Sequence, residues 1–385
     1  GGLSMPVKLG GGSGATNPPL IPDVLLTVST TWSPPYKVKA LVRCFGGGGS
    51  GSVGCMNASY TYPTGALGGG GAGEHAGSIL ELDPAVTYTV VVGVGGVKKS
   101  RSSDGVATGN AGGNTSFAGS GVTTITANGG AGGGSGAGGA STVINLAGAA
   151  GGAGGAGELY RHTGGAGGGA TKASGSNGSN NCMATGGGAV GLFGTGFAGG
   201  AGDLDGRAAS NQQQAAGGGG VNGAGGATSD TTDITYGGST FGPSSAGGGA
   251  LAPGFGFTNN IGNVAPSADA WESTIDFWNG GSLLERVNHT FTQTMGAVSP
   301  PGTGGLGRNG TNFTVSYCTG ASLFAGGAGI AVINYNFPND YRYMIGGRLG
   351  GGGGAGGIIS HSGRTVYSGA GGHGGVLIEM LERIT

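Results

Sequence analysis

Short segments in which apolar and polar residues alternate are the most regular pattern in this chain. In residues 37–45, Val38 and Val42 share one side of an extended chain. Lys39 and Arg43 fall on the opposite side. A period of two is typical of a strand with one buried face. The pattern therefore predicts a half-buried β-strand here, ended by the run of glycines that follows.

Other segments with strand-like patterns are spread over the whole chain. They cover residues 26–32, 79–82, 87–92, 122–127 and 375–380. Asp83-Pro84 is a turn signal between two of them. The last segment lies far from the others in sequence, and we expect it to pair with residues 37–45. The fold class predicted from these segments is mainly β, with a β-sandwich base.

Glycine dominates the segments between the predicted strands and accounts for 102 of the 385 residues. Residues 129–157 and 164–254 consist mostly of Gly, Ala, Ser, Asn and Thr. Such tracts bury little apolar area, and glycine loses the most backbone entropy on ordering. Hydrogen bonds between closely packed backbones would have to order them, so we expect packed helices of polyglycine II type. The alternative is a flexible linker, which the length of the tracts disfavours.

The chain carries few charges, with 16 basic and 17 acidic residues and a formal net charge of −1. Without a basic excess, we expect no nucleic-acid partner. No apolar run approaches the roughly 20 residues of a membrane-spanning helix, so no membrane span is expected. The four cysteines contain no Cys-x-x-Cys pair, and their redox state stays open.

Residues 255–345 differ from the glycine-rich tracts because they contain two of the three tryptophans and many other aromatic residues. We expect a small mixed insert here, with a short helix over residues 268–278. Ser282 and Glu285 fit a capping box that would begin a second helix. The predicted organisation is a lead-in over residues 1–22, a β-sandwich base over 23–128, glycine-rich tracts over 129–254, the insert over 255–345, and a glycine-rich return with the closing strand over 346–385.

Motifs for catalysis are weak or missing. Residues 49–54 match Gly-x-Gly-x-x-Gly, but chance produces several such matches in a chain so rich in glycine. The sequence contains no P-loop, zinc-protease or serine-hydrolase motif, and its five histidines have no paired spacing and suggest turn or surface residues. We predict no catalytic residue, metal site or cofactor, and so a protein that is not an enzyme. The basic cluster 98–101 is a charged hairpin tip or, less favoured, a contact to an anionic surface.

Two segments rich in aromatic and polar residues are the candidates for binding. Tyrosine supplies rigid amphipathic area and asparagine supplies adaptable hydrogen bonds, which suits recognition loops. A tyrosine ring can also pack on the face of a sugar. In the alternative interpretation, Tyr335 and Phe337 fill the core of the insert. The candidate residues are Tyr60, Tyr62, Tyr335, Phe337, Tyr341, Arg342 and Tyr343.

Several motifs follow one another in a specific order. They are Lys37–Arg43 running into Gly46–Gly49, Ser78–Leu82, Asp83-Pro84, Thr87–Gly96, Asn114–Phe117, Ile125–Gly130 and Gly375–Ile378. This order resembles the glycine-rich domain of bacteriophage tail-fibre and tail-tip proteins. The resemblance covers residues 24–157 and 346–385, and residues 255–345 depart from it.

The resemblance implies an adhesin of the virion tail that recognises a glycan or an outer-membrane protein on the bacterial surface. It also implies a homotrimer that works together with other tail-fibre proteins. The alternative is a purely structural glycine-rich protein of a fibre shaft, a sheath or an extracellular matrix. Ice binding is a third class, which the insert disfavours because it interrupts a regular repeat. The aromatic and asparagine-rich segments favour the adhesin.

Overall fold

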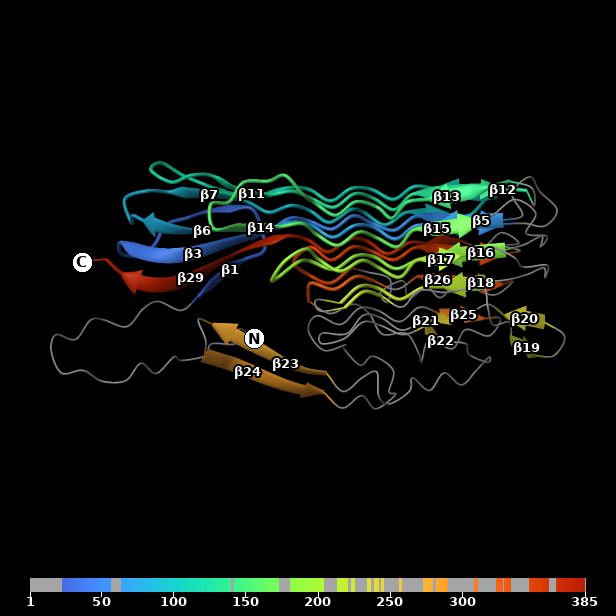
Figure 1. The fold of residues 1–385 in the computed structure, drawn as a ribbon. Helices are drawn as coiled ribbons and strands as arrows, with labels where there is room; N and C mark the ends of the chain where they lie inside the picture. The colour runs from blue at the N-terminus through green and yellow to red at the C-terminus, as the bar shows by residue number, and fades with distance from the viewer. Residues whose placement is uncertain are drawn as a thin grey trace.

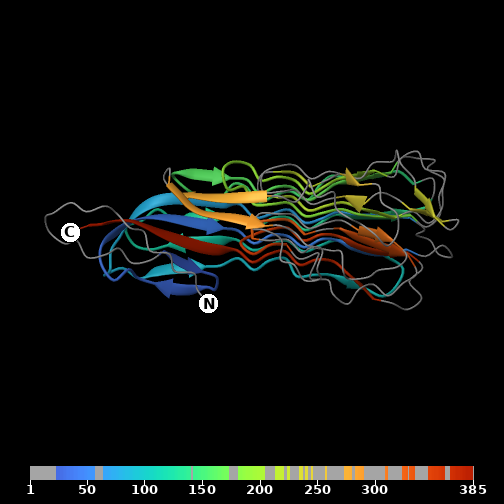
Figure 2. The same ribbon diagram turned by 90° about the horizontal axis from the view of Figure 1, so that it is seen from below.

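A computed structural model of the chain shows an elongated molecule (Figure 1). Strands lie at both ends, and glycine-rich segments run side by side between them, as the view from below also shows (Figure 2). We call the sheets at the end that carries the C-terminus the base, and those at the opposite end the far sheets. The glycine-rich segments between them are the bundle. No described residue is helical. The structure describes residues 23–56, 64–139, 142–172, 181–203, 213–220, 223–225, 323–327, 329–333, 346–359 and 365–384, together with strands β19–β25 between residues 234 and 310.

The base consists of two sheets that pack face to face. The first has the strand order β1-β29-β3-β6-β14, and the second has the order β11-β10-β7-β2. The strands of the first sheet are β1 (Val24–Leu26), β29 (Gly375–Arg383), β3 (Val38–Phe45), β6 (His75–Leu82) and β14 (Tyr160–His162). Those of the second are β11 (Ile125–Ala127), β10 (Thr115–Ala118), β7 (Tyr88–Val91) and β2 (Thr30–Trp32).

Apolar side chains on alternate positions of both base sheets form the largest core of the described residues. Val38 and Val42 of β3 are fully buried, as the alternating pattern predicted, whereas Lys39 is exposed. Between the neighbouring strands β7 and β10 of the second sheet, the rings of Tyr88 and Phe117 stack with their centroids 5.1 Å apart. The base is therefore held together by side-chain packing.

The closing strand pairs with the early strand that the sequence indicated. β29 runs antiparallel to β3, with Gly375 opposite Phe45 and Ile378 opposite Val42. This confirms the prediction that residues 375–380 pair with residues 37–45. The mainly β fold class is confirmed as well, since the regular secondary structure of the described residues consists of strands.

The strands at the opposite end of the bundle are shorter and form several sheets. One sheet contains β25 (Arg308–Gly310), β26 (Ile330–Ile333), β27 (Gly356–Ile359), β4 (Val53–Met56) and β9 (Gly105–Ala107). A second contains β12 (Ser135–Gly138), β5 (Thr64–Leu67), β16 (Asn181–Ala184), β18 (Gln213–Ala215), β21 (Ser244–Ser245) and β22 (Gly256–Phe257). The smaller groups are β13 (Ile144–Leu146), β15 (Ala170–Lys172) and β17 (Gly202–Asp203), the pair β8 (Ser100–Arg101) and β28 (Val366–Tyr367), and the hairpin β19 (Ile234–Tyr236) and β20 (Ser239–Phe241).

The bundle between the two ends is built from glycine-rich tracts whose backbones hydrogen-bond to several neighbours at once. In residues 46–52, successive amide N–H groups donate to three different tracts in rotation. The acceptors are the carbonyls of Glu74, Gly113 and Gly372 for residues 46, 47 and 48, and of Gly71, Asn110 and Gly369 for residues 49, 50 and 51. The rotation repeats every three residues, whereas the residues of a β-strand repeat every two.

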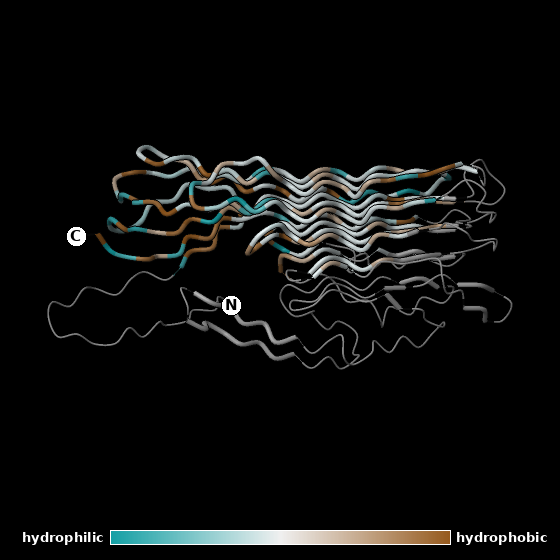
Figure 3. The backbone as a smooth tube through the Cα atoms, viewed as in Figure 1, coloured by the Kyte–Doolittle hydropathy of each residue, from teal (hydrophilic) through white to brown (hydrophobic). Residues whose placement is uncertain are grey.

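The same tract also accepts hydrogen bonds from three further tracts. The amides of Gly96, Gly130 and Gly353 donate to the carbonyls of Gly48, Gly47 and Gly49. Residues 46–52 therefore have six hydrogen-bonded neighbours. The prediction that backbone hydrogen bonds order the glycine-rich tracts is confirmed for their described parts. Figure 3 shows that the bundle is near neutral in hydropathy, whereas apolar and polar residues alternate in the base.

Glycine is needed in the bundle because there is no room for a side chain. A Cβ atom on Gly47, Gly48 or Gly49 would lie well inside van der Waals contact of a backbone carbonyl on a neighbouring tract. None of these three glycines has a positive φ angle. The requirement is therefore close approach of backbones, as at the axis of collagen, and not an unusual backbone conformation.

The described part of the insert differs from the sequence-based expectation. Residues 273–279 and 282–289 form the antiparallel strands β23 (Ser273–Asn279) and β24 (Ser282–His289), not two helices. Ile275, Phe277 and Val287 are β-branched or aromatic, which favours strands. A capping box is a short local signal that this preference overrides. The expectation of a mixed insert is therefore wrong for these residues.

Candidate functional site

The far sheets bring together the ends of strands from distant parts of the chain. β26, β27 and β4 are parallel neighbours in one sheet. Ile333 pairs with Ile359, and Ile359 pairs with Met56. These three residues are the last of their strands, so the chain leaves the sheet at three adjacent positions. The segments that follow are residues 57–63, 334–345 and 360–364.

The neighbouring sheet ends in the same way. Thr64, the first residue of β5, pairs with Asn181 of β16 on one side and with Gly138 of β12 on the other. Cys182 pairs in turn with Gln213 of β18. The strand ends at which these chain connections begin therefore lie at one end of the molecule, on the side away from the base (Figure 1). We call this the loop end.

Small apolar clusters support the strands beneath the loop end. Met56, Leu67 and Cys182 are fully buried in one cluster, and Ile144 and Met183 are buried in another. Because these clusters fill the space between the far sheets, the positions at which the chain leaves the sheets are fixed by packing.

Two polar side chains brace turns near this end. The buried Lys172 donates from Nζ to the carbonyl of Thr142 at 2.8 Å. The Arg101 guanidinium donates to the carbonyls of Ser103, Asp104 and Val106. The cluster 98–101 thus contains an arginine that holds the turn between β8 and β9. These two strands pair with β28 and β4 and not with each other, so the turn is not the tip of a hairpin.

Three of the four cysteines lie within the described residues, and all three are buried free thiols. Burial raises the pKa of the Cys55 thiol to about 12 and raises the pKa of Cys182 even further above its usual range. Burial has the same effect on the pKa of Cys44 in the base. These thiols therefore stay protonated and unreactive near neutral pH. Cys318 lies outside the described residues.

The predicted binding residues lie in two of the segments that begin at the loop end. Tyr60 and Tyr62 belong to residues 57–63, between β4 and β5. Tyr335, Phe337, Tyr341, Arg342 and Tyr343 belong to residues 334–345, after β26. All seven side chains lie outside the described residues. The structure adds that Met56 and Ile333, which precede the two segments, are separated by one strand of a single sheet. Sequence reasoning missed this because the two segments are far apart in the chain.

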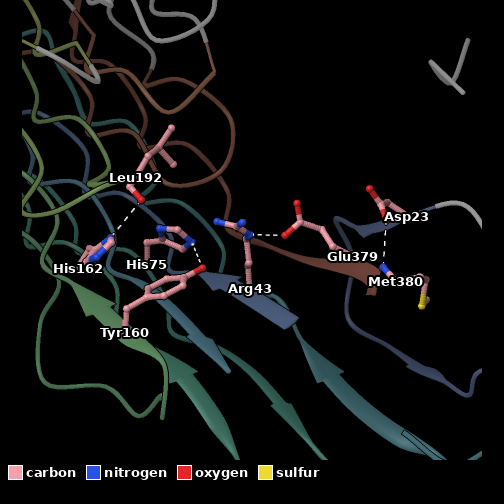
Figure 4. A network of polar contacts seen from close by, with 8 residues as sticks. All are labelled: Asp23, Arg43, His75, Tyr160, His162, Leu192, Glu379 and Met380. Carbon is pink, nitrogen blue, oxygen red and sulfur yellow. Dashed lines mark hydrogen bonds and ion pairs between the residues drawn. The ribbon is translucent and has the colours of Figure 1, made fainter. Parts of the chain in front are cut away.

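A second polar cluster lies where the base meets the bundle (Figure 4). His75 is fully buried, stacks on Phe45 and contacts His162 edge to face. Its Nδ1 donates to the carbonyl of Gly191 at 3.1 Å, so Nε2 accepts from the hydroxyl of Tyr160 at 3.0 Å. The expectation that each histidine lies in a turn or at the surface is therefore wrong for His75, which is part of β6.

The surroundings of this cluster keep it neutral. Burial lowers the pKa of His75 to about 3 and raises the pKa of Tyr160 to about 12. Arg43, which lies over the Tyr160 ring, is paired with Glu379. Among the described residues, no group of three or more His, Cys, Asp or Glu residues is placed to hold a metal ion. Because His75 donates a hydrogen bond to the carbonyl of Gly191, the cluster links the segment at Gly191 to the base.

The Gly-x-Gly-x-x-Gly match at residues 49–54 has no free phosphate-binding amides at its start. The amides of Gly49, Ser50 and Gly51 all donate to carbonyls of neighbouring tracts. They belong to the interior of the bundle, as chance occurrence of the motif had suggested.

The described residues define a mainly β, glycine-rich protein. A family model described as "Glycine-rich domain" matches residues 26–263, which is more than half of the chain. The chain therefore belongs to the glycine-rich domain family. A comparison with curated proteins gives no match. Within the described residues, the structure has no helix that is long and apolar enough to span a membrane.

Proposed function

We propose that this protein is a non-catalytic adhesin of a bacteriophage tail and that the loop end binds a receptor on the bacterial surface. The observation that carries the proposal is the register Ile333–Ile359–Met56. It starts the two segments with aromatic and asparagine-rich sequences two strands apart in one sheet, with only β27 between them. Two recognition segments that begin so close together suit a composite binding site.

The proposal includes the conformation of the bundle, for which we infer packed helices of polyglycine II type. The rotation of hydrogen-bond acceptors every three residues and the six neighbours of residues 46–52 support this inference. Such a bundle would act as a rigid support. Its stability depends on glycine in the tracts and not on the loops, so loop sequences are free to vary with the receptor.

The receptor chemistry follows from the residue types of the two segments. Tyrosine rings such as Tyr341 and Tyr343 pack on sugar faces, and Arg342 pairs with carboxylate or phosphate groups. A glycan of the bacterial surface fits this combination, and an outer-membrane protein is the other receptor class. Weak single contacts would be multiplied in a homotrimer or by several copies on a virion tail, next to other tail-fibre proteins.

The test is the binding of fluorescently labelled protein to a panel of bacterial strains, with free surface polysaccharide as competitor. We expect strain-selective binding that is lost in the double variant Tyr341→Ala/Tyr343→Ala. The matched control is Thr124→Ala, which changes an exposed residue of a base turn and should leave binding unchanged. Polysaccharide that does not compete would indicate a protein receptor. A folded protein that binds no strain would contradict the proposal and favour a purely structural role.

A further inference from the structure

Neighbouring strands of the first base sheet continue into neighbouring tracts of the bundle. β29 follows residues 368–374, β3 precedes residues 46–52, and β6 follows residues 68–74. The first two tracts are joined by the hydrogen bond from Gly48 to Gly372, and the second and third by the bond from Gly49 to Gly71. The order of strands in the sheet is therefore repeated by the order of tracts.

β1 is the exception in this sheet. It pairs with β29, but residues 27–29 lead from it directly to β2 in the second sheet. β2 is also an edge strand, and residues 33–37 lead from it to β3. Among the described residues, no tract of the bundle continues either strand. At this edge, each base sheet is one strand wider than the described bundle.

The tract next to this edge, residues 368–374, has amides that point away from the described bundle. The amides of Gly369 and Gly372 donate to residues 354 and 351, and those of Gly371 and Gly374 donate to residues 96 and 93. The amides between them, of Ala370 and His373, donate to no described residue. They are three residues apart, so they share the third direction of the rotation seen in residues 46–52. They lie on an open side of the tract, where His373 is exposed and Ala370 is half-buried, so a further tract on this side would supply the missing acceptors.

The sequence before β1 contains a segment with the composition of a bundle tract. Residues 10–16 read Gly-Gly-Gly-Ser-Gly-Ala-Thr, close to the Gly-Gly-Gly-Gly-Ser-Gly-Ser of residues 46–52. Six residues, 17–22, connect it to Asp23. An extended chain of six residues spans about 20 Å. Asp23 lies beside β29, because its Oδ1 accepts a hydrogen bond from the amide of Met380. Met380 lies six residues beyond Gly374, which is about 20 Å along β29, so an extended connector brings residue 16 level with Gly374, the near end of this tract.

We propose that residues 10–16 dock along residues 368–374 as an additional tract of the bundle in the same molecule. Their carbonyls would accept hydrogen bonds from the amides of Ala370 and His373. A three-residue period allows only one face of the segment to consist of glycine alone, namely Gly11 and Gly14. That face would lie against residues 368–374, and Ser13, Ala15 and Thr16 would point away. The proposal rests on the hydrogen-bond pattern and is independent of receptor binding.

Hydrogen exchange of the full chain, followed by mass spectrometry at a concentration where sedimentation shows a monomer, tests this docking. We expect the amides of residues 10–16 to exchange slower than an unstructured segment by roughly tenfold or more, which corresponds to about 1.4 kcal/mol. Exchange of residues 10–16 at the unprotected rate would overturn the proposal. Protection that occurs only in an oligomer would also overturn it, since the segment would then dock on a second copy.

A pair of matched glycine variants tests the register. Gly14→Leu should abolish the protection of residues 10–16 and speed exchange at Ala370 and His373 as well. Gly12→Leu, in the position equivalent to Ala15, should leave both unchanged. Exchange of residues 46–52 serves as the folding control and should be the same in both variants. Equal effects of the two substitutions, or no effect of either, would contradict the proposed face.

Discussion

The base and the bundle are stabilised in opposite ways, although one chain passes back and forth between them. The base buries large side chains such as Tyr88 and Phe117 between two sheets. The interior tract 46–52 of the bundle contains only glycine and serine, and its backbone bonds to six neighbours. In the base, stability depends on side chains that fill space; in the bundle, it depends on the absence of side chains. The two regions should therefore respond to substitutions of opposite kinds.

The largest effect should come from removing a large side chain from the base. Phe117 is fully buried and stacks on Tyr88. Phe117→Ala leaves a cavity and should lower the free energy of unfolding by about 4 kcal/mol. Urea denaturation measures this change. A loss below about 1 kcal/mol would show that the base does not depend on its side-chain core.

The reverse substitution should have a large effect in the bundle. A Cβ atom on Gly48 would clash with the carbonyl of Gly351. Gly48→Val should therefore cost about 3 kcal/mol or more, by forcing two backbones apart. The control is Gly139→Val, because a Cβ atom on Gly139 meets nothing within 4 Å. Similar losses in the two variants would show that close backbone packing is not what excludes side chains.

A smaller loss of stability is expected where a side chain, in place of a backbone carbonyl, accepts the hydrogen bonds of two amides. Buried Glu74 lies between the base and the bundle, and its carboxylate accepts hydrogen bonds from the amides of Asn128 and Gly155. Glu74→Ala leaves both amides without that acceptor and should cost about 2 kcal/mol. Glu74→Gln keeps one acceptor oxygen and should cost less. Thermal unfolding of both variants measures the difference, and a glutamine variant as unstable as the alanine variant would refute this account.

The smallest expected effect is a dependence on pH at the same junction. Burial lowers the pKa of His75 from 6.5 to about 3 in the folded protein. The folded state therefore favours the neutral ring, and its stability is greatest above the unfolded pKa and falls as the pH drops below it. Between pH 7 and pH 5.5 the loss from this residue should be about 1 kcal/mol.

Urea denaturation at the two pH values measures this loss. The comparison is His75→Phe, which lacks the titrating ring and should lose about 1 kcal/mol less than the original protein over the same range. An equal loss in both proteins would show that His75 does not cause the acid sensitivity.

Local sequence patterns predicted secondary structure correctly where apolar and polar residues alternated with a period of two. The alternation over residues 37–45 and 375–380 identified two strands and their pairing, because a one-residue shift would expose the buried face. The signals in residues 268–289 were misleading, since a capping box at Ser282 specifies only a helix start and says nothing about strand preference. The burial of His75 was not predictable, because it depends on Phe45, Tyr160 and the turn at Gly191, which are distant in sequence.

The candidate site shows the same limit. Residue types alone marked Tyr60, Tyr62 and residues 335–343 as candidates for recognition, and that assignment stays a prediction. Their sequence separation gave no reason to place the two segments together. The structure adds the register of Met56, Ile359 and Ile333, which depends on which tracts are neighbours in the bundle.

How each region is stabilised follows from its residue types alone. Alternating apolar residues required a core between sheets, and runs of glycine could be ordered only by neighbouring backbones. The tertiary structure decided which backbones are neighbours. Glycine tracts have no side chains that distinguish one neighbour from another, so they carry no pairing code of their own. For the tracts that continue from base strands, the order of those strands supplies that information, because β29, β3 and β6 pass into tracts that are neighbours in the same order.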